Sequence, residues 1–233
     1  MTTLRALAFL TLCATPAFAE PVSLFDGKTL EHFEGNTKLW RVEEGEIRGG
    51  SLTETVKHND FLATKKNYPN FDLRLKLRLA GTGFVNSGVQ IRSIRIPGTS
   101  EMSGYQVDYG PGWYGKLYDE SRRNKVIANS TDPKAVTAAV KEGDWNEYRI
   151  RAEGPRIQTW INGVPALDYT EKDPKIAQDG HIGIQVHGGG KALIQAKDIT
   201  IEELPATPNA PTWKPAAPPA GGKPNETPKP NAP

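Results

Sequence analysis

Titratable and amide side chains recur at alternate positions in several short segments of the chain. Asp108, Glu120 and His187 are groups that could act as acid or base. Asp108 and His187 each lie two residues after a glutamine, Gln106 and Gln185. An acid, a base and amides that both donate and accept hydrogen bonds suit the binding and cleavage of a polyhydroxylated substrate. We therefore take Asp108, Glu120 and His187 as the candidate catalytic residues.

The elements that must position these groups are β-strands, because apolar and polar residues alternate with period two. Successive side chains of a strand point to opposite faces, so the apolar positions fix which polar residues face away from the core. Four pairs then fall on the non-core face: Gln90 and Arg92, Gln106 and Asp108, Lys116 and Tyr118, Gln185 and His187. We expect these pairs to share one solvent-accessible concave surface. The residues expected to be buried between two sheets are Val89, Ile91, Val107, Leu117, Ile184 and Val186.

The expected concave surface supplies the candidates for substrate binding. Arg92 offers a fixed cation that could anchor an anionic intermediate, and Trp113 lies on a glycine- and proline-containing turn where it could stack on a sugar ring. The alternatives stay open: the face could be ordinarily solvated, Trp113 could cover a loop, and Glu120 could pair with Arg122. A one-residue bulge would also move a pair to the wrong face. The substrate-binding candidates are Asn86, Gln90, Arg92, Gln106, Trp113, Lys116, Tyr118 and Gln185.

Turn residues separate the alternating segments and define the fold class. Glycine and proline clusters such as those at 80–83, 110–112, 153–155 and 188–190 end one segment before the next begins. One short helix is expected, from Pro133 to Val140. Many short strands joined by such turns predict an all-β, two-sheet jelly-roll sandwich. Strands are expected at 71–79, 88–94, 105–109, 114–119, 147–152, 156–161, 181–187 and 192–201.

Composition divides the 233 residues into three parts. Residues 1–19 contain Arg5, a short apolar run and the small-x-small sequence Ala17-Phe18-Ala19, which predict a cleavable signal peptide and a periplasmic or secreted protein. Cys13 could instead be a lipoprotein cysteine, but the residue before it, Leu12, is not the usual small one. Residues 20–204 are the expected β-domain.

The third part, residues 205–233, contains ten prolines in 29 residues, with Trp213 as its only large apolar side chain. Such a segment cannot bury enough surface to offset its ordering entropy, so we expect a disordered, extended spacer. It could serve as a tether that contacts the cell envelope, or as a specific ligand for a partner. Removing residues 206–233 is expected to leave thermal stability nearly unchanged.

Charge and cysteine content exclude several functional classes. The net charge of +2 is spread along the chain, which gives no reason to expect nucleic acid as a partner, and no segment after the signal is long and apolar enough for a transmembrane helix. The only cysteine lies in the signal, which excludes thiol catalysis and cysteine metal sites. His181 and His187 would lie roughly 20 Å apart on one extended strand, too far to share an ion. No cofactor is identified, although a calcium site built from loop oxygens would leave no motif.

Several short motifs occur in a fixed order along the β-domain, and as a set they resemble the 3-keto-disaccharide hydrolase domain family over about residues 22–202. The resemblance implies a concanavalin A-like jelly roll, an exported location and action on 3-keto-glycosides. The motifs are Leu24-Phe25-Asp26-Gly27-Lys28-Thr29-Leu30, Trp40 with Gly45-Glu46-Ile47, Asn86-Ser87-Gly88 with Ile91-Arg92, Gly104-Tyr105-Gln106-Val107-Asp108, Tyr114-Gly115-Lys116-Leu117-Tyr118-Asp119, Gly143-Asp144-Trp145-Asn146, Asn162-Gly163 and Gly180-His181-Ile182-Gly183-Ile184-Gln185-Val186-His187-Gly188.

The resemblance also implies a reaction. The carbonyl at C3 of a 3-keto sugar acidifies the C2 proton, so a base can remove it, the enolate can expel the group on C1, and water can then add back. An ordinary glycosidase would use two carboxylates, for which Asp108 and Glu120 are the available pair. The main alternative is a non-catalytic, lectin-like carbohydrate-binding module on a proline-rich spacer. A third interpretation is a structural envelope protein whose tail reaches across the cell wall.

The first prediction concerns processing. Because Ala17-Phe18-Ala19 reads as a cleavage site, the mature chain should begin at Glu20. Sequencing the N-terminus of protein purified from an exporting host checks this. Recovery of a lipid-modified Cys13, or of the uncleaved chain, would contradict it.

Overall fold

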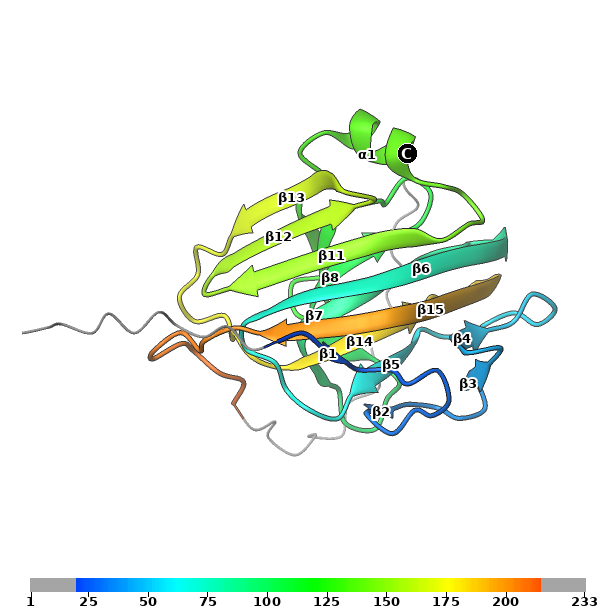
Figure 1. Ribbon diagram of the computed structural model, residues 1–233, viewed down its shortest axis with the longest axis horizontal. Coiled ribbons are helices and arrows are strands. Elements are labelled where there is room, and N and C mark those ends of the chain that lie inside the picture. Colours follow the sequence, from blue (N-terminus) through cyan, green and yellow to red (C-terminus); the bar gives the residue numbers. More distant parts are fainter. Residues whose placement is uncertain (1–19, 215–233) are drawn as a thin grey trace, which may run out of the picture.

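The computed structural model describes residues 20–214, and the predicted signal peptide and the end of the predicted tail, 215–233, lie outside the described residues. The all-β prediction is confirmed: two antiparallel sheets pack face to face (Figure 1). In the described part of the chain, sheet A has eight strands and sheet B has seven. Sheet A contains β1 (Val22–Ser23), β3 (Trp40–Glu43), β4 (Glu46–Gly50), β6 (Phe71–Gly83), β11 (Asn146–Glu153), β12 (Arg156–Ile161), β13 (Val164–Thr170) and β15 (Gly190–Glu203). Sheet B contains β2 (Phe33–Glu34), β5 (Asp60–Thr64), β7 (Ser87–Arg95), β8 (Met102–Tyr109), β9 (Leu117–Glu120), β10 (Lys125–Ala128) and β14 (His181–Val186).

Strand order shows which segments can build one surface. Sheet B runs β10-β9-β8-β7-β14-β5-β2, so the four segments expected to carry polar pairs lie side by side in its middle. Sheet A runs β13-β12-β11-β6-β15-β4-β3, with β1 paired to β15. The long strands β6 and β15 form the centre of sheet A, where the alternation of Phe71–Leu79 puts leucines toward sheet B and charged residues outward.

The core lies between the two sheets, as the alternation predicts. All six apolar residues expected inside are at most 2% exposed and belong to one continuous cluster. Burying each such side chain contributes roughly 1.5–3 kcal/mol, so this layer fixes the facing of every strand in sheet B. The polar neighbours are thereby forced to the other face wherever the alternation is unbroken.

Some elements differ from the expected ones. The helix α1 spans Pro133–Ala139, with Asp132 capping it through a 3.0 Å bond from the Ala135 amide, and Val140 is already extended. Strand β9 begins at Leu117, so Lys116 lies on the preceding turn rather than in the strand. Seven of the described strands were not expected. β1, β2 and β3 are only two to four residues long, and β4, β5, β10 and β13 interrupt the period-two pattern with glycine, proline or consecutive apolar residues.

The alternation fails at one position in the middle of sheet B. The register of β7 against β8 shifts between Ile91 and Ile94, so Arg92 and Ser93 together oppose Gly104. Arg92 takes a positive φ of 49°. A Cβ on Gly104 would lie 2.3 Å from the Ser93 hydroxyl, and one on Gly180 would lie 2.5 Å from the Arg92 carbonyl carbon. Glycines on both sides therefore make room for a β-bulge.

The bulge overturns the predicted facing of Arg92, which does not lie on the outer face with Gln90. Its guanidinium is buried at the end of the sandwich and donates to Pro69 O at 2.7 Å, Gly154 O at 2.6 Å and Asn70 Oδ1 at 2.9 Å. All three acceptors belong to loops that flank strands of sheet A. Burial without a paired carboxylate lowers the pKa of Arg92 to about 10. Arg92 thus ties the middle of sheet B to sheet A.

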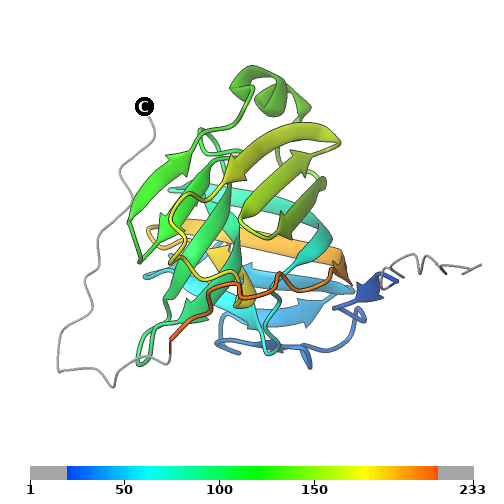
Figure 2. The same ribbon diagram turned by 90° about the vertical axis from the view of Figure 1, so that its left-hand side faces the viewer.

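The first ten residues of the predicted proline-rich tail contact the domain, contrary to the expectation of a spacer without contacts. The Asn70 side chain donates to Pro205 O at 2.6 Å, and the Gln178 amide donates to Pro211 O at 2.8 Å. Trp213 follows with two further hydrogen bonds. Figure 2 shows this segment, in orange, crossing the end of the sandwich. These contacts run counter to the expectation that removing residues 206–233 costs no stability.

Among the described residues, no helix is long and apolar enough to cross a membrane.

The second prediction concerns Arg92. Arg92→Ala leaves three buried acceptors without a donor, so we expect a loss of about 3 kcal/mol in the free energy of unfolding. The matched control is Arg74→Ala on the outer face of β6, whose side chain is 50% exposed and should change stability by less than about 1 kcal/mol. Denaturant unfolding of both variants checks this. Equal losses in the two would contradict the role of Arg92 as a tie between the sheets.

Candidate functional site

The outer surface of sheet B carries a row of polar residues that we call the polar face. Gln90, Gln106 and Tyr118 lie directly opposite one another across β7, β8 and β9. In the next row, Asp108 on β8 and Gln185 on β14 lie on either side of Gly88. The polar face consists of Asn86, Gln90, Gln106, Asp108, Tyr118, Glu120, Gln185 and His187.

Glycines in the strand interiors let the amides lie flat on this face. A Cβ on Gly88 would lie 2.6 Å from the Cγ of Gln106, so only glycine leaves the Gln106 side chain room to cross β7. Gly183 plays the same part beside Gln90, where a Cβ would lie 2.8 Å from the sulfur of Met102 and 3.3 Å from the Cβ of Gln90. Glycine inside a strand commonly marks such a close approach.

The amides form one hydrogen-bonded chain. Ser93 Oγ donates to Gln90 Oε1 at 2.6 Å, and Gln90 Nε2 donates to Gln106 Oε1 at 3.0 Å. Gln106 Nε2 then donates both to Asp108 Oδ1 at 2.8 Å and to Gln185 Oε1 at 3.1 Å. An ionised carboxylate can only accept, so Asp108 fixes which end of each amide points where. Gln185 therefore turns its Nε2 donor away from the chain.

The central residues of the polar face are buried, so the prediction of a solvent-accessible surface is wrong for them. Gln90, Gln106, Asp108 and Gln185 are each 0% exposed. They satisfy one another across the glycines instead of extending toward water. Measurable exposure remains for three other residues of the face: Tyr118 at 5%, Glu120 at 6% and His187 at 7%. We call these three the rim.

His187 directly follows β14 and is held by contacts with its neighbours. Its backbone amide donates to Asn86 O at 3.2 Å, its Nδ1 lies 2.6 Å from Gly188 O, and its ring meets that of Phe84 edge-on at 4.5 Å. A carbonyl can only accept, so the neutral imidazole carries its proton on Nδ1 and its lone pair on Nε2. The Asn86 amide beside it is buried, and neither its oxygen nor its nitrogen has a hydrogen-bond partner among the described residues.

Tyr118 and Glu120 lie on β9 at the other side of the polar face. Burial, and then the negative charges of Glu120 and Asp108, raise the pKa of Tyr118 to about 12. Tyr118 therefore keeps its hydroxyl proton at neutral pH. The Trp113 ring packs edge-on against Tyr118 at 6.4 Å, and Lys116 Nζ lies 4.8 Å from the centre of the Trp113 ring. The turn before β9 thus brings an aromatic ring and a cation to this side.

The sequence of this domain matches one protein family across both sheets. The match to the 3-keto-alpha-glucoside-1,2-lyase-like domain covers residues 20–202. The chain belongs to this family. The resemblance found from the ordered motifs is therefore confirmed.

Solved structures share the fold of this lyase-like domain. A candidate glycosyl hydrolase from Parabacteroides distasonis superposes with a TM-score of 0.60 at 18% identity, covering 79% of this chain and 94% of that one. A carbohydrate-binding module from Bacillus subtilis gives 0.54 at 14% identity, covering 80% and 97%. At these identities the likeness shows the sandwich fold alone.

One curated relative matches a part of the chain. A pelota homolog from Methanospirillum hungatei is 29% identical over 143 residues, which are 60% of this chain and 36% of that protein. The chain thus spans little more than a third of the length of the relative it matches. This match assigns no activity to the lyase-like domain.

The lyase-like domain brings most of the predicted site residues together. The polar face unites the three catalytic candidates with Asn86, Gln90, Gln106, Tyr118 and Gln185, while Trp113 and Lys116 adjoin it from the turn before β9. Arg92 alone is directed elsewhere. Ser93, Gly88 and Gly183 were missed, and glycines inside alternating strands were the available signal for two of them. Among the described residues, no cluster of His, Cys, Asp or Glu could hold a metal ion.

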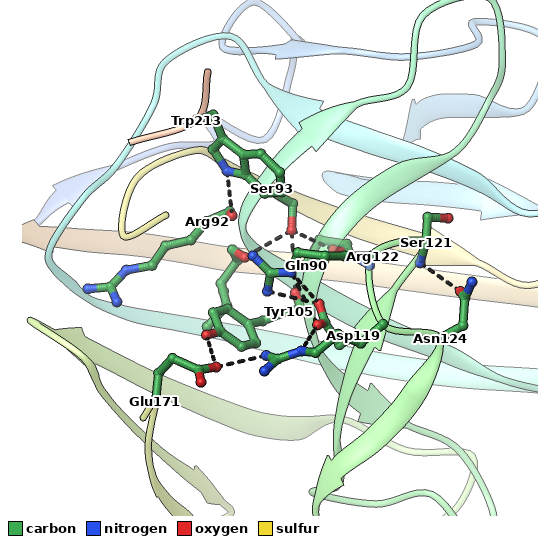
Figure 3. Close-up of polar contacts among 12 residues, drawn as sticks. Gln90, Arg92, Ser93, Tyr105, Asp119, Ser121, Arg122, Asn124, Glu171 and Trp213 are labelled. Carbon is green, nitrogen blue, oxygen red and sulfur yellow. Dashed lines mark hydrogen bonds and ion pairs between the residues drawn. The ribbon is translucent and has the colours of Figure 1, made fainter. Parts of the chain in front are cut away.

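A buried ion cluster lies on the opposite side of β9 (Figure 3). Asp119 is 0% exposed and accepts from Arg122 Nε at 2.9 Å and from Arg123. Arg123 also reaches Glu171 at 2.7 Å, and the Tyr105 hydroxyl donates to Glu171 at 2.6 Å. Burial disfavours the charge of Glu171, but these hydrogen bonds outweigh it and lower its pKa to about 2. Arg122 therefore has a partner other than Glu120, which stays on the polar face.

The third prediction tests the polarity of the amide chain. Gln106→Glu replaces two N–H donors by a carboxylate facing Asp108 and the Gln185 carbonyl, so one carboxyl pKa should rise. A carboxyl whose folded pKa is raised lowers stability above that pKa and ceases to do so as the pH falls through it. The variant should thus be less stable than the wild type at pH 7.5, by about 2 kcal/mol, with the deficit shrinking below pH ~5.

The control for this prediction is the same substitution beside an exposed carboxylate. Gln158→Glu places the new charge near Asp168, to which Gln158 donates at 3.3 Å on the outer face of sheet A. Solvent screening should keep its cost below about 1 kcal/mol. Melting curves between pH 4 and 8 compare the two variants. A pH-independent deficit in Gln106→Glu would show that the chain is not oriented by Asp108.

Proposed function

We propose that this protein is an exported enzyme that cleaves the glycosidic bond of 3-keto-glycosides, by base-assisted elimination across C1 and C2 followed by addition of water. Family membership supports a carbohydrate with a carbonyl at C3 as the substrate. The observation that carries the proposal is a base and a neutral hydroxyl donor on one polar face, His187 and Tyr118. Both side chains keep a small exposed fraction, 5% for Tyr118 and 7% for His187, beside the buried amides that position them.

His187 is the proposed base. Its Nε2 lone pair takes the proton from C2, which the neighbouring C3 carbonyl acidifies. The electron pair of the broken C2–H bond passes into the enolate, whose charge rests on the C3 oxygen. The electron pair on the C3 oxygen then re-forms the C3 carbonyl, the C1=C2 double bond forms and the C1–O bond breaks. The products are an alcohol and a 2-hydroxy-3-keto-glycal. Addition of water across C1=C2 completes a net hydrolysis.

Donors on the polar face are suited to the charge that develops. The Tyr118 hydroxyl is the proposed donor to the enolate oxygen, because its raised pKa keeps it protonated. Lys116 and the buried Gln185 Nε2, whose N–H groups have no hydrogen-bond partner among the described residues, add a cation and an amide donor, and they take the role first assigned to Arg92.

Glu120 pairs with Gly104 at the far end of β8, whereas His187 lies beside Asn86 before β7, so the two are too far apart to act on one sugar. The protonated His187 is instead the proposed acid for the departing C1 oxygen. Asp108 acts through Gln106 to hold the amides in one orientation.

The fourth prediction is turnover. The purified mature protein should release the alcohol from a 3-keto-disaccharide, as followed by mass spectrometry. His187→Ala should lower the rate by about 10²-fold, because proton transfer by a positioned group contributes that much or more. Asp108→Asn should lower it by a similar factor, because the amides that position the substrate lose the acceptor that orients them. In deuterated water, recovered substrate or product should carry deuterium at C2, which direct displacement at C1 would not introduce.

His181→Ala is the matched control, because His181 begins the same strand but its Nδ1 bonds to Thr64 O at 2.6 Å and lies away from His187. Its rate should stay within about threefold of wild type once folding is verified by its melting temperature. Saturable binding of the 3-keto-disaccharide without any product would contradict catalysis and favour the lectin-like binding module. If the protein shows neither binding of the 3-keto-disaccharide nor product, the proposal is wrong altogether.

A further inference from the structure

The segment after β15 is bound along its length to loops at one end of the sandwich. The Leu204 amide donates to Asn70 O at 3.0 Å, and the Asn70 side chain returns bonds to Pro205 O at 2.6 Å and Thr207 Oγ1 at 3.0 Å. The Asn70 Oδ1 also accepts the hydrogen bond from the Arg92 guanidinium. We call residues 205–214 the strap. Its attachment uses the same loop that anchors the β7 bulge.

Trp213 fastens the far end of the strap to sheet B. Its indole Nε1 donates to the Arg92 carbonyl at 3.0 Å, and its backbone amide donates to Asp179 Oδ1 at 3.0 Å. The Arg122 guanidinium lies 5.3 Å from the Trp213 ring and 4.5 Å from the Tyr105 ring. Figure 3 shows the three side chains together, with Trp213 beside the bulge. An arginine flanked by two aromatic rings is a strong cation–π arrangement.

Arg122 connects this contact to β9, the strand that carries two of the three rim residues. Its Nε donates to both carboxylate oxygens of Asp119, at 2.9 and 3.1 Å. Asp119 lies between Tyr118 and Glu120 on β9 and points to the opposite side of the strand. β9 has four residues and pairs with β8 and β10, and on its inner side Arg122 and Arg123 hold Asp119. A displacement of Arg122 would thus be transmitted through Asp119 to the two rim residues on β9, Tyr118 and Glu120.

We propose that Trp213 is a positioning residue: the strap belongs to the functional domain and, through Arg122 and Asp119, holds Tyr118 and Glu120 in place on the polar face. The domain therefore extends at least to Trp213, nine residues beyond the end expected from composition. The inference adds to the proposed function, and its activity readout rests on it. Its structural readout does not depend on any substrate.

The fifth prediction compares three full-length variants by hydrogen–deuterium exchange at 25 °C. Trp213→Ala should raise the exchange rate of the amides in residues 117–124 by about 10-fold, since it removes the ring and the indole donor. Trp213→Phe keeps a ring over Arg122 and should restore most of the protection. The control is Trp160→Ala, which removes a ring 4.5 Å from Arg149 on sheet A and should leave residues 117–124 unchanged.

Kinetics on the 3-keto-disaccharide add a second readout. Trp213→Ala should lower kcat by about 10-fold with a smaller change in KM, because misplaced catalytic groups slow the chemical step. If the wild type shows no turnover but exchange in 117–124 rises as expected, the proposed function fails and the positioning role stands. Unchanged exchange in Trp213→Ala would overturn the positioning role, whatever the activity.

Discussion

The bulge at Arg92 and Ser93 is the constraint on which the rest of the site depends. One extra residue in β7 sends Arg92 to the end of the sandwich and leaves Ser93 on the outer face beside Gln90. The same distortion presents the Arg92 carbonyl to Trp213. Without it, an arginine would continue the polar row and no hydroxyl would close the amide chain. Gly104 and Gly180 are required because any side chain there would collide with the bulge.

The amide chain illustrates why a buried polar network must be complete. Each central member is fully buried, so a donor or acceptor left without a partner would cost about 1–3 kcal/mol. Asp108 at one end can only accept, and Ser93 at the other end donates, so the amides between them have a single consistent orientation. The atoms left over are then informative. The Gln185 Nε2 and the Asn86 amide are the groups whose hydrogen-bonding capacity the described residues do not use.

Period-two alternation was enough to predict the sandwich, the buried residues and most members of the polar face. It misplaced Arg92, because the extra residue between Ile91 and Ile94 shifts the alternation within the strand. It also missed the burial of Gln106, which depends on the absence of a side chain at Gly88 on the neighbouring strand. The strap was missed for a different reason. Proline-rich composition indicates a spacer on average, whereas here Trp213 and the carbonyls of Pro205 and Pro211 bind the segment to the domain.

The two sides of β9 show how structural and chemical charges are kept apart. Asp119 points away from the polar face, where Arg122 and Arg123 balance its charge. Tyr118 and Glu120 point toward it, so Tyr118 responds chiefly to burial and to the carboxylates on its own side. A cation as close to Tyr118 as these carboxylates would oppose their effect and lower the pKa of Tyr118. Placing both arginines behind the strand therefore preserves a neutral hydroxyl donor beside Glu120, which is what the proposed elimination requires of the group that stabilises the enolate.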